Sequence, residues 1–252
     1  MEIDYTKTAK DYKENNYVVI KNFISKELAG FLYDYGRMMA NKASWHIANK
    51  FAHYNPDTDG TYNDSQAPGS YSNYADAAME TLLSGVTPGM RKITGLNLTP
   101  TYSYWRLYVN GAELKRHKDR PSCEVSTTLC LGYDNSNLKG KKENWQDYNW
   151  PMWVEKSGHV GKKGVPIYMK PGDMIVYRGC LIEHWREKFL GNNHAQVFLH
   201  YNDLDGPYGE NCKFDGRPAL GLPSHYKSKE KMAKMNEIDG QLLEDQKKEY
   251  NE

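Results

Sequence analysis

Three residues of the chain carry side chains that could hold a metal ion together: His117, Asp119 and His184. His117 and Asp119 are two positions apart, so on a β-strand both would point to the same face of the sheet while Lys118 faces away. Two imidazoles and one carboxylate form the ligand set that binds non-haem Fe(II) on one side and leaves other coordination positions open. The spacing therefore predicts a metal site with oxygenase chemistry, provided that a neighbouring strand brings His184 alongside.

The flanking sequence places these residues at the ends of strands. Residues 102–109 alternate between two sets of side chains and end at Asn110-Gly111, a pattern typical of a strand followed by a turn. Residues 167–179 predict a strand, a turn at Pro171-Gly172 and a second strand, with a break at Gly179 shortly before His184. All three candidate ligands are thus expected beside turns.

Taken together, five segments resemble the Fe(II)- and 2-oxoglutarate-dependent dioxygenases, and the prolyl-hydroxylase-like branch in particular. They are residues 17–24, Tyr108-x-x-Gly111, His117-x-Asp119, Lys170-Pro-Gly-Asp173 and His184. The resemblance extends over residues 15–203. It implies a mainly β fold with flanking helices, namely a double-stranded β-helix of the jelly-roll or cupin-like barrel type. It also implies Fe(II), O2 and 2-oxoglutarate as reactants, release of succinate and CO2, and ascorbate as a supporting reductant.

The reaction that the resemblance implies is hydroxylation of a C–H bond. Halogenating relatives have Gly or Ala at the carboxylate position, so Asp119 argues for hydroxylation. A peptide or protein side chain is the substrate that this branch favours, and a small molecule is the alternative. Fold analogy alone does not choose between them.

The anchor for the distal carboxylate of 2-oxoglutarate departs from the family pattern. Related enzymes usually place an Arg or Lys about ten residues after the second histidine, whereas this chain has His194 at that position. Arg186 is our first choice, because a planar guanidinium matches a carboxylate and stays charged. Lys188 and His194 are alternatives, and His194 would have to be protonated or act as a neutral donor.

Further cosubstrate contacts are expected from hydroxyl groups. Tyr108 resembles a tyrosine that hydrogen-bonds the cosubstrate in related enzymes, although core packing is its alternative role in a chain with 20 tyrosines. Ser126 and Thr128 lie two apart on the strand predicted after the metal motif, so both could face the same pocket.

Other interpretations of these residues stay open at this point. His117 and Asp119 could form a solvated surface pair, and Arg186 could be an ion-pair partner of Glu183 or Glu187. At the level of function, the barrel could be a non-oxidative cupin-type metalloenzyme with another divalent metal. It could also be a binding module for a peptide or a glycan.

Composition narrows the functional classes. The net charge of +1 and the pI near 7.6 argue against a general polyanion binder, because nucleic-acid affinity needs a concentrated cationic surface. The four cysteines show no C-x-x-C spacing and no dense framework. No signal segment and no apolar run of membrane-spanning length is evident, so we expect a cytoplasmic protein of undefined oligomeric state.

The 252 residues are expected to form a single domain. Residues 1–100 are predicted to supply helical support and a long loop, residues 101–203 the β-barrel core, and residues 204–252 a charged, helical tail. The loop at residues 51–74 is either a substrate lid or disordered. Helices are predicted at residues 75–83 and 88–93, the second capped by Thr87 with Pro88 in its first position.

A longer helix is predicted to begin after Ser25, whose hydroxyl can cap it. Its apolar side, expected to pack on the barrel, consists of Leu28, Phe31, Leu32, Tyr35 and Met39.

Overall fold

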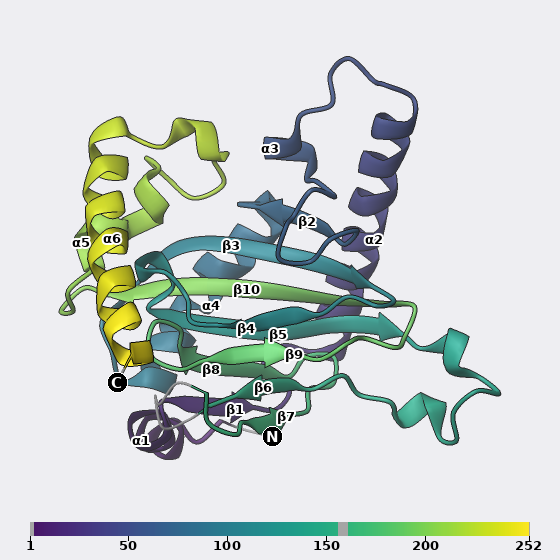
Figure 1. Ribbon diagram of the computed structural model, residues 1–252, viewed down its shortest axis with the longest axis horizontal. Coiled ribbons are helices and arrows are strands. Elements are labelled where there is room, and N and C mark those ends of the chain that lie inside the picture. Colours follow the sequence, from purple (N-terminus) through teal and green to yellow (C-terminus); the bar gives the residue numbers. More distant parts are fainter. Residues whose placement is uncertain (1–2, 156–160, 252) are drawn as a thin grey trace.

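The computed structural model describes residues 3–155 and 161–251, and two antiparallel sheets form its centre (Figure 1). In spatial order, the larger sheet consists of β1 (Tyr17–Ile20), β8 (Met174–Arg178), β5 (Val125–Asp134), β10 (Asn193–Asp203), β3 (Leu98–Val109) and β2 (Tyr71–Tyr74). The smaller sheet consists of β4 (Leu114–His117), β9 (His184–Arg186), β6 (Met152–Val154) and β7 (Val165–Ile167). The longest strands, β3, β5 and β10, are neighbours at the middle of the larger sheet.

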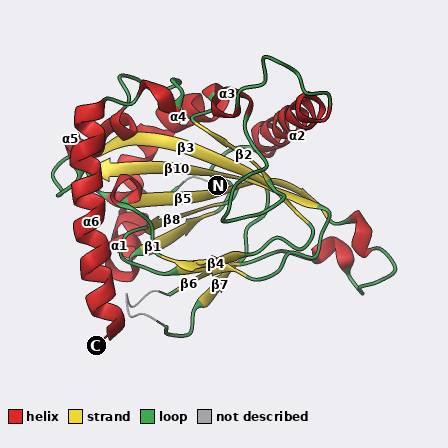
Figure 2. Cartoon of the chain, turned by 45° about the horizontal axis from the view of Figure 1, so that its top comes forward, coloured by secondary structure: helices red, strands yellow, loops and turns green. Residues whose placement is uncertain are grey.

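Helices flank the sheets (Figure 2). They are α1 (Tyr5–Asn15), α2 (Lys26–Ala48), α3 (Pro56–Asp59), α4 (Ala77–Thr94), α5 (Gly209–Cys212) and α6 (Lys229–Asn251). Helices α1, α2 and α4 contact strands of the larger sheet, while α6 runs across one end of the strands. The predicted mainly β class with flanking helices is confirmed, as is the C-terminal helix. Within the described parts of the chain, none of the helices combines the length and the apolar character that crossing a lipid bilayer requires.

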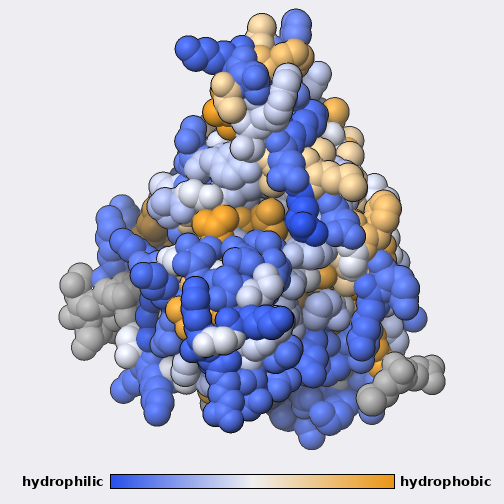
Figure 3. Space-filling view, turned by 90° about the vertical axis from the view of Figure 1, so that its right-hand side faces the viewer, coloured by the Kyte–Doolittle hydropathy of each residue, from blue (hydrophilic) through white to orange (hydrophobic). Residues whose placement is uncertain are grey.

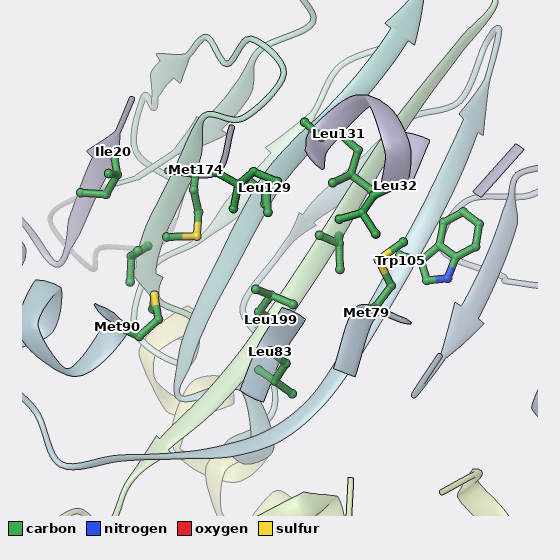
Figure 4. Close-up of a cluster of buried hydrophobic side chains, with 14 of the residues drawn as sticks. Ile20, Leu32, Met79, Leu83, Met90, Trp105, Leu129, Leu131, Met174 and Leu199 are labelled. Carbon is green, nitrogen blue, oxygen red and sulfur yellow. The ribbon is translucent and has the colours of Figure 1, made fainter. Parts of the chain in front are cut away.

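Alternation along the central strands creates two separate cores. On β5, Leu129 and Leu131 belong to the cluster beneath α2 and α4, together with Leu83 (Figure 4). Cys130, between them in sequence, belongs instead to a cluster with Met152 of the smaller sheet. Successive side chains of a strand point to opposite faces, so one face of the larger sheet binds the helices and the other faces the smaller sheet. The space for a site lies between the sheets.

The predicted packing side of α2 is wrong in part. Ser25 does cap the helix, because its hydroxyl accepts a hydrogen bond from the Leu28 amide. However, Leu28 and Phe31 are 40% and 67% exposed. Figure 3 shows that apolar residues also lie on the outer surface of the molecule, among hydrophilic ones. The buried residues of α2 are mostly small: Ala29, Leu32, Gly36, Ala40 and Ala43. A Cβ on Gly36 would lie 2.8 Å from the Trp105 ring, so close approach of helix and sheet selects small residues here.

The two short helices predicted at residues 75–83 and 88–93 are one continuous helix, α4, capped by Asp76 rather than Thr87. Pro88 lies inside it, although an interior proline removes one helical hydrogen bond. Pro88 and Ser84, whose carbonyl loses its donor, are both exposed, so water can reach that carbonyl. Buried side chains occur in the helix both before and after Pro88, and their packing outweighs the tendency of proline to end a helix.

The segment at residues 51–74 is more ordered than the sequence suggested. It contains α3 and ends in β2, which pairs antiparallel with β3 from Tyr71 opposite Leu107 to Tyr74 opposite Tyr104. Its polar composition reflects side-chain hydrogen bonds within the segment, such as Tyr71 Oη to the Asp59 carbonyl. Of the two alternatives for this segment, a lid or disorder, the structure therefore shows an ordered segment.

Candidate metal centre and cavity

The three candidate ligands converge between the two sheets. His117 is the last residue of β4 and lies opposite His184, the first residue of β9, in the register of the smaller sheet. Asp119 Oδ1 is 3.4 Å from His184 Nε2 and 3.8 Å from His117 Nε2. One ligand atom from each residue lies within 4.8 Å of the others. Asp119 follows the end of β4 instead of continuing the strand, and its amide is fixed by the Gly179 carbonyl at 2.8 Å.

Backbone carbonyls orient both imidazoles. His117 Nδ1 lies 2.7 Å from the Lys115 carbonyl, and His184 Nδ1 lies 3.3 Å from the Ile182 carbonyl. Since a carbonyl can only accept, the neutral form of each ring would carry its proton on Nδ1 and keep the lone pair on Nε2. Both Nε2 atoms face the Asp119 carboxylate, which is the arrangement that a shared cation needs.

The protonation states suit a divalent cation. Burial, with a further contribution from His184, lowers the pKa of His117 to about 4, so this imidazole is neutral at pH 7. Burial acts to raise the pKa of the Asp119 carboxyl, but the adjacent imidazoles of His184 and His117 outweigh it and hold that pKa below its usual range. A charged carboxylate beside neutral imidazole is the form in which these groups bind metals.

A cavity of about 570 Å³ adjoins the three residues. Its lining comes from both sheets, from the segment at Asp64–Gln66 and from Ser224 and Lys227 near the C-terminal helix. Of the residues predicted to contact the cosubstrate, Arg186 and Thr128 line this cavity, whereas Tyr108, Lys188 and His194 are not among its lining residues.

Arg186 is a buried cation whose charge is not neutralised by a salt bridge within the described part of the chain. Its Nη1 donates to the Trp150 carbonyl at 2.7 Å, and its guanidinium lies 4.6 Å from the centre of the Trp150 ring. Its Nη2 is buried and has no hydrogen-bond partner among the described residues. Burial lowers the pKa of Arg186 to about 10, which leaves it charged at neutral pH. The alternative pairing with Glu183 is not observed, because Glu183 binds Arg116 at 2.5 Å.

The other basic candidates are placed differently. Lys188 is exposed. His194 is buried and stacks on Tyr133 with ring centres 5.3 Å apart. Its Nε2 lies 3.0 Å from the side-chain nitrogen Nε2 of Gln196. Burial, together with the charge of Arg186, holds the pKa of His194 well below its usual value, so the ring is neutral. A protonated His194 is therefore not the cation of this site.

Tyr108 is also fully buried and does not line the cavity. Its hydroxyl is 3.4 Å from Arg106 Nη1, and its ring meets the edge of the Trp150 ring at 5.0 Å. Tyr108 and His194 thus both pack around Trp150, the residue whose carbonyl holds Arg186.

An ion pair fixes the segment above the cavity. Arg106 donates from Nε to Asp64 Oδ2 at 2.6 Å and from Nη2 to Gln66 Oε1 at 2.7 Å. The Asp64 and Arg106 side chains are 9% and 6% exposed. The predicted lid segment therefore does reach the cavity, and it is attached to β3 by a largely buried contact.

His200 is a site residue that sequence reasoning missed. It lies on β10 in the cavity wall, and its Nδ1 is 3.0 Å from Ser126 Oγ, which in turn donates to Asp119 Oδ2 at 2.7 Å. Ligand atoms of Asp119, Cys123 and His200 form a second group within 4.8 Å of one another. The alternation of His194, Gln196, Phe198 and His200 on one face of β10 was the available signal.

Comparison with known proteins supports the architecture. No family model matches the sequence, and the search of curated proteins found no match. Among solved structures, a Pseudomonas putida prolyl-4-hydroxylase has a TM-score of 0.55 at 15% identity, over 79% of this chain and 98% of that one. EctD from S. alaskensis, solved with 2-oxoglutarate and 5-hydroxyectoine, has a TM-score of 0.54 at 17% identity, over 88% and 84%.

A third similar structure is SnoK, an alpha-ketoglutarate-dependent carbocyclase from nogalamycin biosynthesis. Its TM-score is 0.55 at 10% identity, over 86% of this chain and 92% of that one. At such identities the likeness is one of fold. The resemblance noticed in the sequence is confirmed at that level, because this chain shares the fold of these oxygenases.

Proposed function

We propose that the chain is a non-haem Fe(II)- and 2-oxoglutarate-dependent dioxygenase that hydroxylates a C–H bond of its substrate, with release of succinate and CO2. The observation that carries the proposal is the convergence of His117, Asp119 and His184 on a cavity whose wall also holds Arg186, a buried guanidinium with no salt bridge to any described residue. A surface ion pair or a glycan-binding face would not need a buried cation in the wall of a cavity.

The donor set fits Fe(II). Two imidazoles with free Nε2 lone pairs and one charged carboxylate match the two-histidine, one-carboxylate ligand set. When bound, Fe(II) would supply the oxygen chemistry that couples oxidation of 2-oxoglutarate to oxidation of the substrate. The protein's own contribution is to fix the three side chains and to shape the cavity beside them.

Arg186 would bind the distal carboxylate of 2-oxoglutarate. Its Nη1 is already held by the Trp150 carbonyl, so the guanidinium is oriented before the cosubstrate arrives. Its buried Nη2 lacks a partner in the described structure, and a carboxylate oxygen would satisfy it. The Thr128 hydroxyl lines the same cavity. Tyr108 and His194 would act indirectly, by packing against Trp150.

The substrate is a peptide or protein side chain or a small molecule. The solved structures with this fold include a prolyl hydroxylase in complex with a peptide fragment, and EctD with 5-hydroxyectoine. Hydroxylation is the outcome that we favour, because Asp119 supplies the carboxylate ligand.

Succinate formation tests the proposal directly. Protein reconstituted anaerobically with Fe(II), then given ascorbate, 2-oxoglutarate and air, is expected to release succinate. Asp119→Ala should abolish that release, because it removes the anionic ligand. Lys188→Gln, a change of an exposed residue, is the matched control. Turnover that persists without oxygen would instead favour a non-oxidative metalloenzyme, and failure to bind metal would favour a binding module.

A further inference from the structure

The two oxygens of the Asp119 carboxylate have different surroundings. Oδ1 is the oxygen near both histidines, at 3.4 and 3.8 Å from their Nε2 atoms. Oδ2 accepts a hydrogen bond of 2.7 Å from Ser126 Oγ, on β5 of the other sheet. The second oxygen of the carboxylate is thus held by a residue of the larger sheet.

The number of available protons decides which group donates in the contact between Ser126 and Asp119. Ser126 Oγ is 2.7 Å from Asp119 Oδ2 and 3.0 Å from both the Cys123 carbonyl and His200 Nδ1. The hydroxyl has a single proton, and a charged carboxylate that can only accept is the strongest of these acceptors. Ser126 Oγ can then accept from His200 Nδ1–H. The result is a relay in which His200 orients Ser126, and Ser126 orients Asp119.

The backbone leaves the carboxylate little freedom to turn. Gly179 lies against it, and a Cβ at this position would be 2.4 Å from Asp119 Oδ2 and 2.7 Å from Ser126 Oγ. The Gly179 carbonyl also accepts the Asp119 amide at 2.8 Å. Ser126 is fully buried and His200 is 6% exposed, so bulk water does not replace these contacts.

We propose that Ser126 and His200 are positioning residues for the metal site. They occupy Asp119 Oδ2, so that only Oδ1 is presented on the side of the histidines and further coordination positions stay available. This inference rests on the proposed function, because it assumes that the three residues bind a metal ion. Loss of such an outer contact typically weakens metal affinity by roughly 10–100-fold.

Metal affinity, rather than activity, provides the test. Mn(II) alone is titrated into apo-protein by calorimetry for the wild type, Ser126→Ala and Thr127→Ala. Thr127 is the matched control, because it is the next residue on β5 and its buried hydroxyl accepts from the Leu199 amide at 3.0 Å, away from Asp119. We expect the Kd to rise roughly 10–100-fold in Ser126→Ala and to change little in Thr127→Ala.

A second pair of variants keeps the test decisive if Ser126→Ala folds poorly. His200→Asn retains a donor near the position of Nδ1, whereas His200→Leu removes it, so metal affinity should fall less in the first variant than in the second. The visible spectrum of bound Co(II), which reports coordination number, should change in Ser126→Ala and not in Thr127→Ala. Equal affinities and spectra in all variants would overturn the relay. A wild type that binds no metal would overturn the proposed function itself.

Discussion

At the scale of single residues, Arg186 carries an energetic cost that a ligand can remove. A buried guanidinium without a neutralising carboxylate is expensive to keep in the protein interior. Arg186→Met is therefore expected to raise the free energy of unfolding of the cosubstrate-free protein. The same change should raise the KM for 2-oxoglutarate at least tenfold, because losing one partner of a buried charge pair costs about 2–5 kcal/mol.

Succinate formation at varied 2-oxoglutarate concentration measures the KM. Thermal unfolding of Mn(II)-loaded protein, with and without 2-oxoglutarate, measures stability and cosubstrate binding. The cosubstrate should raise the Tm of the wild type by mass action and leave Arg186→Met almost unchanged. Lys188→Gln should behave like the wild type, since Lys188 is exposed. An equal rise in Tm for Arg186→Met and the wild type would show that another cation binds the distal carboxylate.

The residues of the metal motif could be foreseen because the signal is local. His117 and Asp119 are neighbours in sequence, and the turn residues that position them are adjacent. The role of Ser126 toward Asp119 could not be foreseen, because it depends on which carboxylate oxygen faces which sheet. His200 likewise becomes a site residue only when β10 lies beside β5.

At the scale of elements, burial of the side chains along α2 does not follow their size or apolar character. Phe31 and Leu32 are neighbours of similar character, yet Phe31 is 67% exposed and Leu32 is 4% exposed. Leu32→Ala is expected to lower the free energy of unfolding by about 2–5 kcal/mol, because it leaves a cavity in the core. Phe31→Ala should change it by no more than about 0.5 kcal/mol. Urea unfolding of the two variants provides the comparison, and similar losses for both would contradict the assignment of faces.

The sequence could not show which side of α2 packs against the sheet, since apolar periodicity gives most weight to large side chains. The helix instead buries small residues such as Ala29, Gly36 and Ala40, and at Gly36 the Trp105 ring leaves no room for a larger side chain. The same limit applies to α4, where Pro88 is a strong local signal for a helix start. Burial of Met79, Leu83 and Met90 on a single face overrides it.

At the scale of the whole molecule, the segment after β10 is tied to the cavity wall by one buried carboxylate. Asp215 is fully buried and accepts from Arg120 Nη1 at 2.9 Å, from Lys227 Nζ at 2.7 Å and from the Tyr74 hydroxyl at 2.7 Å. These donors come from distant parts of the sequence. No periodic pattern links them, so the sequence suggested only a charged tail.

The contacts of Asp215 should make the free energy of unfolding depend on pH in the acid range. Burial acts to raise the pKa of Asp215, but Arg120 and Lys227 outweigh it and hold that pKa well below its usual range. A carboxyl whose pKa is lowered by folding stabilises the protein above its unfolded pKa of about 3.9, and this stabilisation is lost as the pH falls through the lower, folded value. Asp215→Asn should therefore destabilise the protein by about 1.5–3 kcal/mol at neutral pH, because it removes the charged acceptor of the hydrogen bonds from the partly buried Arg120 and Lys227.

The difference between Asp215→Asn and the wild type should then shrink as the pH is lowered below about 4, where the wild-type carboxyl begins to lose its own charge in the unfolded chain and then in the folded one. Urea unfolding at neutral and acid pH measures it. Glu230→Gln, on the exposed side of α6 and paired only with the exposed Lys234 in the described structure, is the control and should cost little at either pH. A loss for Asp215→Asn that stays constant with pH would mean that packing, rather than charge, joins the C-terminal segment to the site.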